Sequence, residues 1–361
     1  MHSKNISPDL KNIEEKLNST IEKGIAYLED HQLPNGEFLM YMSGDDAMQG
    51  WNLPESCVFP AALIGNCLLP LRGQEKVENI LVKAAKFLHY QMGRGGTWNH
   101  YTILHRYRNL CPQDLDDTAC VSHFLKTMDF DVPTERNQQL ILDNRRSDGL
   151  FYTWFTFRFR FNKNPMYWYL AAKELKYLFK SLVFWQQAGC ERHDVDTVVN
   201  ANILYYMGIR KETEPIIPYL INVIKKGKEN DCDKWYRNTL TVYYFITRNY
   251  YKGILKLGEI RSEIIDRILS EHQKDGSFRK SDLETALALS SLIHLKYNGH
   301  EIEEGIHYLI GKQLTKGNWK RWAFYYSGPT KPSSFGSEEL TTAFCLESLA
   351  LYKKALSKKG I

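Results

Sequence analysis

The chain has 361 residues, of which 43% are hydrophobic and 25% charged, so it can bury a large core and does not have the composition of a disordered protein. Its net charge of +5 is spread over short basic runs, such as 225–228 and 353–354, which favour solvated faces over a nucleic-acid surface. Seven cysteines without a C-x-x-C pair indicate buried thiols in a reducing compartment, and neither a disulfide framework nor a structural zinc site.

Neither a targeting segment nor a membrane-spanning segment is expected. Residues 1–30 are amphipathic and contain no apolar signal core. The longest apolar run, 57–71, is short and is interrupted by Pro60 and Asn66. We therefore expect a cytoplasmic protein without a transmembrane segment.

A first set of helices is predicted by apolar residues at i, i+3 and i+4 spacing. These helices cover 9–31, 75–91, 134–144, 212–226, 257–273 and 301–314. Five turns along the chain share one pattern, in which Gln or another polar residue precedes a glycine and then an aromatic residue. The glycines lie at positions 36, 96, 149, 276 and 317. This repetition, at intervals of roughly 40 to 60 residues with one decayed stretch, indicates an array of helical repeats.

A second set of helices is predicted to begin after the turns. We place their starts near 54–55, 114–119, 193–197, 233–235, 281–286 and 337–342. Six helix pairs predict an all-α fold, in which residues 1–361 form a single (α/α)6 toroid domain with six inner and six outer helices. In such a ring the inner helices begin at one mouth, so the acidic residues at their starts converge there.

An aromatic-rich stretch at 155–187 does not fit this count of pairs. It contains alternating aromatic and basic residues over 155–161 and a further amphipathic helix. We interpret it as an insertion before the third inner helix. It forms either a strand or flap over the mouth, or extra packing on the outside of the ring.

Three carboxylates crowd into four positions at Asp114, Asp116 and Asp117, within the sequence D-L-D-D-T-A over 114–119. Crowded like charges cost free energy unless something uses them. Two roles account for them. They can cap a helix N-terminus, or they can keep a carboxylic acid protonated for chemistry.

The glycine-aromatic turns resemble the repeats of the terpene cyclase and protein prenyltransferase superfamily, and 114–119 is similar to the D-x-D-D-T-A motif of squalene-hopene and other class II terpene cyclases. This resemblance implies an isomerase or lyase that cyclises a polyisoprenoid, and a prenyl diphosphate is one candidate substrate. It also implies that Asp116, the middle carboxylate, protonates an alkene or epoxide. Asp117 and Asp114 are then the candidate helpers.

Carbocation chemistry also needs aromatic surfaces, because an aromatic face stabilises a nearby cation by about 0.5–2 kcal/mol. Many aromatic residues lie near the predicted turns and inner-helix starts, and most aromatics at helical spacing are simply core. The substrate-binding candidates among them are Trp98, Tyr101, Trp235, Trp322 and Phe335.

A second polar group follows 193–197. Asp194 and Asp196, with Asn200 and Asn202, could bind Mg²⁺ and a diphosphate, or could orient a polar substrate. Alternatively, they cap the helix and bond neighbouring helices. We therefore expect no cofactor, or Mg²⁺ if the substrate is a diphosphate. The basic run 105–108 could form a rim for that diphosphate, with a solvated loop as the alternative.

One departure from the resemblance concerns the size of the chain. Class II cyclases usually place the acid between two helical domains, and this chain is long enough for one. The insertion, a loop or the partner in a homodimer must then close the cavity. A peripheral membrane contact also stays open.

Two other functions remain. In a carbohydrate-active enzyme, Asp116 and Asp196 would act as a pair of carboxylates. A non-catalytic toroid would bind a lipid or a protein through its aromatic mouth.

Overall fold

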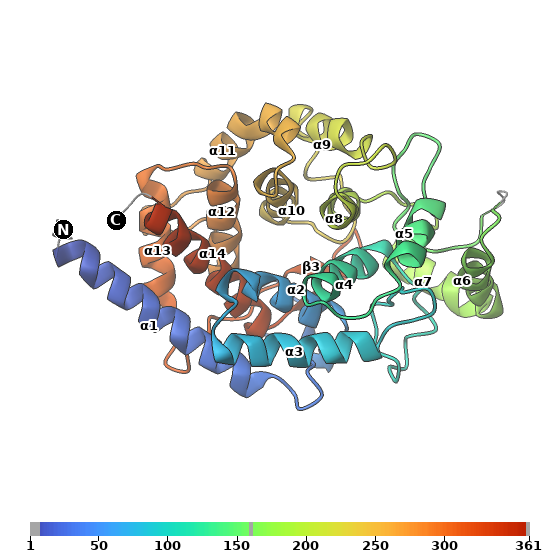
Figure 1. The fold of residues 1–361 in the computed structure, drawn as a ribbon, viewed down its shortest axis with the longest axis horizontal. Coiled ribbons are helices and arrows are strands. Elements are labelled where there is room, and N and C mark those ends of the chain that lie inside the picture. Colours follow the sequence, from blue (N-terminus) through green and yellow to red (C-terminus); the bar gives the residue numbers. More distant parts are fainter. Residues whose placement is uncertain (1–7, 159–161, 359–361) are drawn as a thin grey trace.

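The computed structural model describes residues 8–158 and 162–358 and is mostly helical (Figure 1). Within these residues, six largely buried helices lie at the centre. They are α2 (Phe59–Leu68), α4 (Leu115–Thr127), α8 (Thr197–Met207), α10 (Thr239–Tyr251), α12 (Asp282–His294) and α14 (Glu338–Lys358). Each contacts the next in this order, and α14 also contacts α2. The contacts among the central helices therefore close on themselves.

The remaining paired helices lie outside this group. They are α1 (Pro8–His31), α3 (Glu75–Tyr90), α5 (Thr134–Asp143), α9 (Ile216–Lys225), α11 (Arg261–Leu269) and α13 (His300–Lys312). Two short 3₁₀ helices, η1 (Leu69–Leu71) and η2 (Leu255–Ile260), extend α2 and precede α11. The outer helices overlap the ranges predicted from the apolar spacing.

Two predicted starts of central helices are wrong. Residues 54–55 belong to a β-strand, and α2 begins at Phe59. Residues 233–235 lie in a loop, and α10 begins only at Thr239. There the Asn238 side chain accepts the backbone N–H of Leu240 at 3.0 Å and caps the helix. An acidic residue ahead of an apolar run therefore does not by itself fix where a helix begins.

The glycine of each repeated turn packs against an outer helix or its N-terminal flank. A Cβ at Gly36 would lie 2.1 Å from the Lys83 carbonyl oxygen on α3, and one at Gly276 would lie 2.6 Å from that of Glu304 on α13. At Gly317 it would lie 2.3 Å from the Lys23 carbonyl oxygen on α1. The last turn therefore packs against the first helix, and α1 also contacts α14, so the first and last helices lie in the same region (Figure 1).

The aromatic residue of each turn is fully buried. These residues are Phe38, Trp98, Phe151, Phe278 and Trp319. Burial of one such ring stabilises the fold by about 3 kcal/mol relative to exposure. Three of their backbone N–H groups donate to a threonine on the following central helix. These threonines are Thr118, Thr285 and Thr342.

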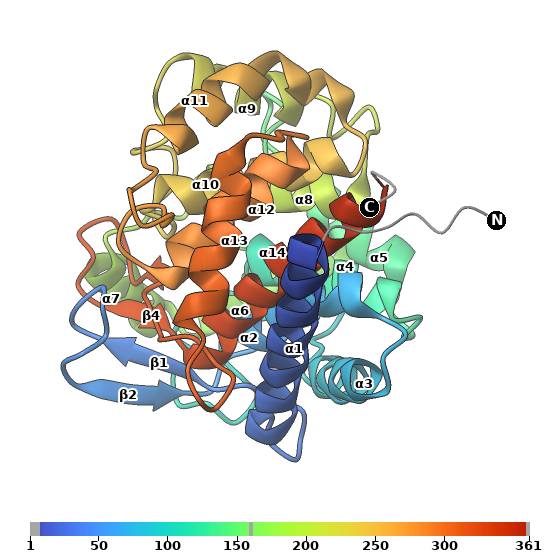
Figure 2. The ribbon, with the colours of Figure 1, turned by 90° about the vertical axis from the view of Figure 1, so that its left-hand side faces the viewer.

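A small antiparallel sheet corrects the all-α prediction. Its order is β2-β1-β4-β3, with β1 (Met40–Ser43), β2 (Asn52–Glu55), β3 (Tyr325–Tyr326) and β4 (Ser334–Gly336). Met42 pairs with Phe335 across β1 and β4. These strands are two to four residues long, too short for an alternating pattern to reveal them. They lie on the side of the molecule that also holds α7 (Figure 2).

The stretch at 155–187 contains two helices, α6 (Pro165–Lys176) and α7 (Leu178–Ala188). The prediction of one further helix was therefore one too few. Residues 159–161, which belong to the predicted strand or flap, lie outside the described residues. Residues 155–158 are irregular backbone without strand assignment.

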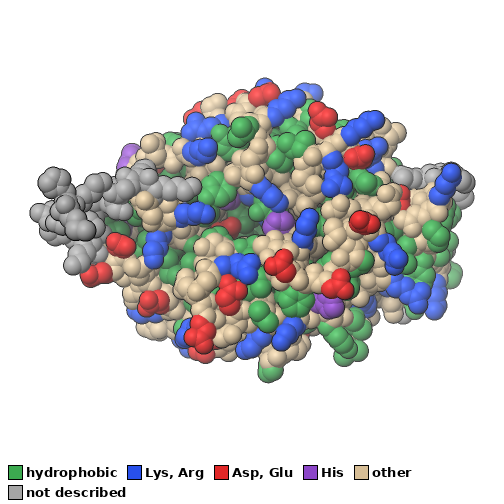
Figure 3. Space-filling view, in the orientation of Figure 1, with side chains coloured by type: hydrophobic (Ala, Val, Ile, Leu, Met, Phe, Trp, Pro, Cys, Tyr) green, Lys and Arg blue, Asp and Glu red, His purple; other side chains and the backbone are tan. Residues whose placement is uncertain are grey.

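The surface agrees with the dispersed charge expected from the sequence. On the face in Figure 3, basic and acidic side chains alternate without a large patch of one sign. Among residues 8–158 and 162–358, no helix combines the length and apolar character needed to span a bilayer.

Candidate active site

A cavity of about 420 Å³ adjoins the N-terminal ends of α2 and α4. This volume lies within the range of roughly 300–1,000 Å³ typical of small-molecule sites. Aromatic residues form the largest group in its walls, and three carboxylates and one imidazole also line it. The lining residues are Met42, Phe59, His100, Tyr101, Tyr107, Leu110, Cys111, Asp114, Asp116, Asp117, Thr153, Trp154, Phe184, Gln187, Ala188, Val199, Trp235, Tyr325, Tyr326, Ser327, Pro332, Ser333 and Phe335.

The first turn of α4 presents the carboxylates to the cavity. Asp114 has an extended backbone, and its carboxylate accepts the Asp117 N–H at 2.7 Å, so it is the N-cap. The capping role and the cavity-facing role therefore coexist in one motif. Asp116 and Asp117 follow in the first helical turn, where both line the cavity.

Both carboxyl oxygens of Asp116 have a partner on another element. The Asn202 side-chain amide, from α8, donates to Oδ1 at 2.5 Å, and the Tyr236 hydroxyl donates to Oδ2 at 2.5 Å. Burial raises the pKa of Asp116 above its ordinary value, although Tyr236, Asn202 and the charge of Arg248 act to lower it. Burial and these hydrogen bonds therefore act on the Asp116 carboxyl group in opposite directions.

Asp117 and His100 form a second titratable pair beside Asp116. His100 Nδ1 lies 3.6 Å from Asp117 Oδ2, and His100 Nε2 lies 3.1 Å from the Tyr325 hydroxyl. Burial, followed by a contribution from the charge of Asp116, raises the pKa of Asp117 to about 7, although Asp114 acts to lower it. Burial also raises the pKa of Asp114, with a further contribution from Asp117.

The raised pKa of Asp117 predicts a pH dependence of stability. Its value of about 7 exceeds the ordinary 3.8, so the folded state binds the proton more tightly than the unfolded chain. The stabilisation is complete below about pH 4 and is lost as the pH rises through about 7. In urea unfolding from pH 4 to 8, we expect Asp117→Asn to lose less stability with rising pH than the native chain. Equal slopes would contradict the assignment.

Aromatic rings surround the acidic group on several sides. Trp154 lies at the centre of one cluster, with ring centroids of Phe184, Trp185 and Trp235 at 5.4, 5.5 and 5.5 Å. Trp154, Phe184 and Trp235 from this cluster face the cavity. On another wall, the rings of Tyr325 and Phe335 stack at 5.0 Å.

Not all predicted substrate-binding residues reach this cavity. Tyr101, Trp235 and Phe335 line it. Trp98 is fully buried, and its indole N–H donates to the Leu88 carbonyl at 2.8 Å, so it packs within its turn. Trp322 packs partly buried against the main core and is not among the lining residues.

The structure places Asn200 in a packing role. Its amide oxygen accepts the Phe151 N–H at 2.9 Å, and its NH₂ group donates to the Phe151 carbonyl at 3.1 Å. Asn200 therefore accepts the backbone N–H of the aromatic residue in this turn, as a threonine does in three other turns. Asn202, two residues further along α8, contacts Asp116 instead.

Asp194 and Asp196 bond to protein groups and are not among the residues that line the cavity. Asp194 Oδ1 pairs with Lys234 Nζ at 2.6 Å, and its Oδ2 accepts the Glu191 N–H at 2.7 Å. Asp196 accepts the Thr153 hydroxyl at 2.6 Å and the Lys234 N–H at 3.0 Å. Within the described ranges, no cluster of His, Cys, Asp and Glu could hold a metal ion. Asp194 and Asp196 therefore have protein donors as their partners in this structure.

The sheet and α7 supply one wall of the cavity. Met42, Tyr325, Tyr326 and Phe335 come from β1, β3 and β4, and α7 adds Phe184, Gln187 and Ala188. The loop after β3 packs on the end of α7, because a Cβ at Gly328 would lie 1.9 Å from the Ala188 carbonyl oxygen.

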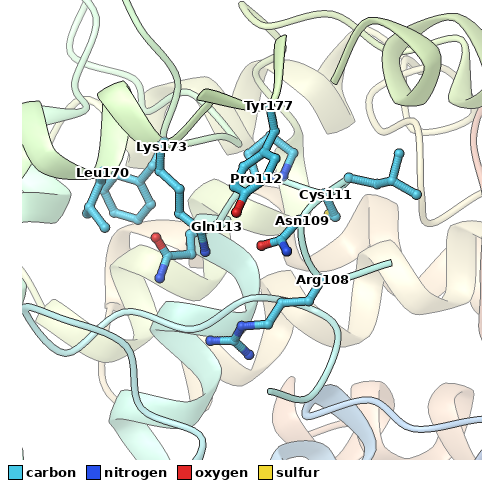
Figure 4. Close-up of a pocket in the computed structure, with 10 residues that line it drawn as sticks. Arg108, Asn109, Cys111, Pro112, Gln113, Leu170, Lys173 and Tyr177 are labelled. Carbon is cyan, nitrogen blue, oxygen red and sulfur yellow. The ribbon is translucent and has the colours of Figure 1, made fainter. Parts of the chain in front are cut away.

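A smaller pocket of about 20 Å³ lies behind Leu110 and Cys111, which line both spaces. Figure 4 shows Arg108, Asn109 and Gln113 on one loop, with Lys173 and Tyr177 across from them. The pocket has room for about one water molecule. Of the predicted basic rim, Arg108 lines this pocket and Tyr107 lines the main cavity, whereas His105 pairs with Glu55 at 2.7 Å.

The groups that hold Asp116 are not evident from the sequence. Asn202 was grouped with Asn200, Tyr236 was one of many aromatics near a helix start, and Arg248 was not singled out. Arg248 carried a usable signal, because it is the one charged residue in the otherwise uncharged stretch 239–251. Such a residue is rarely buried without a specific partner.

No protein-family model matches the chain, and no curated protein matches it. Solved structures do match. A variant of type II terpene cyclase MstE from Scytonema, without ligand, has a TM-score of 0.70 at 14% identity over 96% of this chain and 99% of that one. Another MstE variant, in complex with merosterolic acid A as product, has a TM-score of 0.68 at 15% identity over 96% and 99%. A protein from Actinoplanes has a TM-score of 0.67 at 15% identity over 93% and 99%. The chain therefore has a class II terpene cyclase-like fold.

Proposed function

We propose that this protein is a class II terpene cyclase, an isomerase or lyase in which Asp116 protonates a polyisoprenoid. In this proposal residues 1–361 form a single (α/α)6 toroid. The observation that carries it is a carboxyl group with a raised pKa that faces an aromatic cavity. The likeness of the fold to MstE supports the same assignment.

Protonation of an alkene makes two conflicting demands on the acid. It must keep its proton near neutral pH, and its conjugate base must be stable once the proton leaves. Burial acts toward the first demand, because it raises the pKa of Asp116 above its ordinary value. The hydrogen bonds from Asn202 and Tyr236 meet the second, because they strengthen as negative charge develops on the carboxylate.

The proposed reaction conserves the formula of the substrate. The Asp116 proton forms a C–H bond while the alkene π bond breaks and leaves a tertiary cation. Further alkenes of the chain attack that cation and close rings. Loss of a proton from another carbon ends the reaction. Faces of Trp154, Trp235 and Phe335 line the cavity in which the cations form.

The substrate panel should include more than prenyl diphosphates. One MstE structure is described as a complex with geranylgeranyl dihydroxybenzoate as substrate, a prenylated arene. Here the cavity lining within the described residues contains no Lys or Arg, the usual partners of a diphosphate. Prenylated arenes therefore belong beside the diphosphates as candidates.

The alternative function, a carbohydrate-active enzyme, has less support. It needs a second carboxylate across the cavity from Asp116. Asp196, the residue suggested for that role, bonds to Thr153 and Lys234 and is not among the lining residues. No observation favours a non-catalytic toroid over an enzyme.

The first experiment is incubation of the purified protein with a panel of polyprenyl compounds, followed by mass spectrometry. The panel contains geranyl, farnesyl and geranylgeranyl diphosphates, squalene and a geranylgeranylated dihydroxybenzoate. We expect one or more of them to give a product of unchanged mass and altered retention time. Conversion of none by protein that is folded by circular dichroism would count against the proposal.

A further inference from the structure

A buried cation, Arg248, contacts Asn202, which in turn contacts Asp116. Arg248, on α10, is only 6% exposed. Within the described part of the chain it forms no ion pair with a carboxylate, and it packs between the rings of Tyr205 and Phe245, at 4.3 and 4.6 Å from their centroids. Its Nη2 group donates a hydrogen bond to the Asn202 side-chain oxygen. Burial of a cation without a carboxylate partner costs free energy, so a buried arginine of this kind indicates a specific role.

The arginine fixes which way the Asn202 amide faces. A guanidinium has five donors and no acceptor, so only the amide oxygen of Asn202 can point at Arg248. The NH₂ group must then face Asp116, and it lies 2.5 Å from Oδ1. Oδ1 therefore accepts a hydrogen bond along this direction and cannot carry the acidic proton there.

Tyr236 occupies the other carboxyl oxygen of Asp116. Its hydroxyl donates to Oδ2 at 2.5 Å. The Tyr236 ring is held by Phe59, Phe245 and Phe324, with centroids at 6.4, 5.3 and 5.7 Å. Each carboxyl oxygen therefore accepts one hydrogen bond and keeps one further lone pair for the acidic proton, and Asp116 lines the cavity.

We propose that Arg248 and Asn202 are positioning residues. Arg248 orients the Asn202 amide so that its NH₂ group donates to Oδ1 of Asp116, and the charge of the guanidinium makes Asp116 a stronger acid. The effect of these two residues on catalysis rests on the proposed function. The protonation of Asp116 can nevertheless be measured without any substrate.

Several charged and titratable groups surround Asp116, so the effect of Arg248 has to be separated from theirs. They are Asp114, Asp117 and Cys120 on α4, His100 on the preceding loop, Tyr236 before α10 and Arg248 on α10. Arg248 and His100 favour the ionised form of Asp116. Removal of the Arg248 charge should therefore raise the pKa of Asp116 and weaken the acid.

The test compares Arg248→Gln with Arg248→Lys. Infrared difference spectra against Asp116→Asn isolate the C=O stretch of the Asp116 carboxyl, which is titrated in substrate-free protein. In Arg248→Gln we expect the pKa of Asp116 to rise by about one unit, equivalent to a tenfold weaker acid. In Arg248→Lys, which again offers only donors to Asn202, we expect most of this rise to disappear.

Turnover provides the second readout. Arg248 is not among the residues that line the cavity, so Arg248→Gln should lower kcat by about tenfold or more while KM changes by less than about twofold. The pH at which kcat falls on the alkaline side should rise together with the pKa. A fall in kcat at all pH values, with the alkaline limb and the pKa unchanged, would show a merely structural role.

Asn202→Asp provides a variant that keeps the arginine paired. The new carboxylate can accept from Arg248, but it offers no donor to Asp116 Oδ1 when ionised. We expect it to fold and to raise the pKa of Asp116. If neither Asn202→Asp nor Arg248→Gln moves the infrared titration, the proposal is wrong. A shifted titration in a protein that converts no prenyl substrate would support the positioning role of Arg248 and Asn202 and refute the cyclase function.

Discussion

Asp116→Asn is expected to lower turnover of a polyprenyl substrate on the order of 10⁴-fold or more, the upper range for loss of a positioned general acid. An amide has nearly the shape of the carboxyl group, so its oxygen can still accept from Asn202 and its NH₂ group can donate to Tyr236. It has no proton that can be transferred to carbon. The measurement is product formation by mass spectrometry, together with thermal unfolding of the variant.

Asp282→Asn is the matched control for this substitution. Asp282 is another acidic residue in the first turn of a central helix, and it is largely buried outside the cavity lining. We expect this variant to retain activity within about threefold, because a residue remote from the reacting groups affects turnover only through the fold. Activity of Asp116→Asn close to that of the native chain would rule out Asp116 as the acid.

Gly317→Ala is expected to destabilise the chain by about 3 kcal/mol or more. Gly317 has φ of +95°, and a Cβ there would lie 2.3 Å from the Lys23 carbonyl oxygen on α1. Alanine therefore adds backbone strain and also forces apart the contact between the last turn and the first helix. The measurement is the shift in the urea midpoint of the purified variant.

Gly73→Ala separates the cost of backbone strain from the cost of the steric clash. Gly73 has φ of +94°, but a Cβ there would meet nothing within 4 Å. This variant carries the backbone strain alone, and we expect a loss of about 1 kcal/mol. Equal losses in the two variants would show that the contact between the last turn and α1 contributes nothing to stability.

The sequence was a good guide to the helices because their signals are local. Apolar spacing predicted the outer helices, and a glycine followed by an aromatic residue marked the turns that pack against them. The contact of Gly317 with α1 shows why these turns need glycine, since no side chain fits there. The strands were not predicted, because Tyr325–Tyr326 and Ser334–Gly336 are too short to show alternation and depend on partners far away in the chain.

The site could be predicted only in part. The sequence 114–119 marks the carboxylates, because their crowding is visible within one turn. The groups that hold Asp116 come from α8 and from the loop before α10, and nothing local to Asn202 or Tyr236 states which residue they will meet. The sequence could not decide between the two roles considered for Asn200 for the same reason, since its partner Phe151 becomes evident only once the turn is folded.

Incorporation of solvent deuterium into the product tests the central claim most directly. The Asp116 carboxyl exchanges its proton with water, so in D₂O the acid delivers deuterium to the alkene carbon that it protonates. We predict a cyclised product that carries one deuterium at that carbon, as located by mass spectrometry and NMR. A cyclised product with only hydrogen at that carbon would contradict protonation by Asp116.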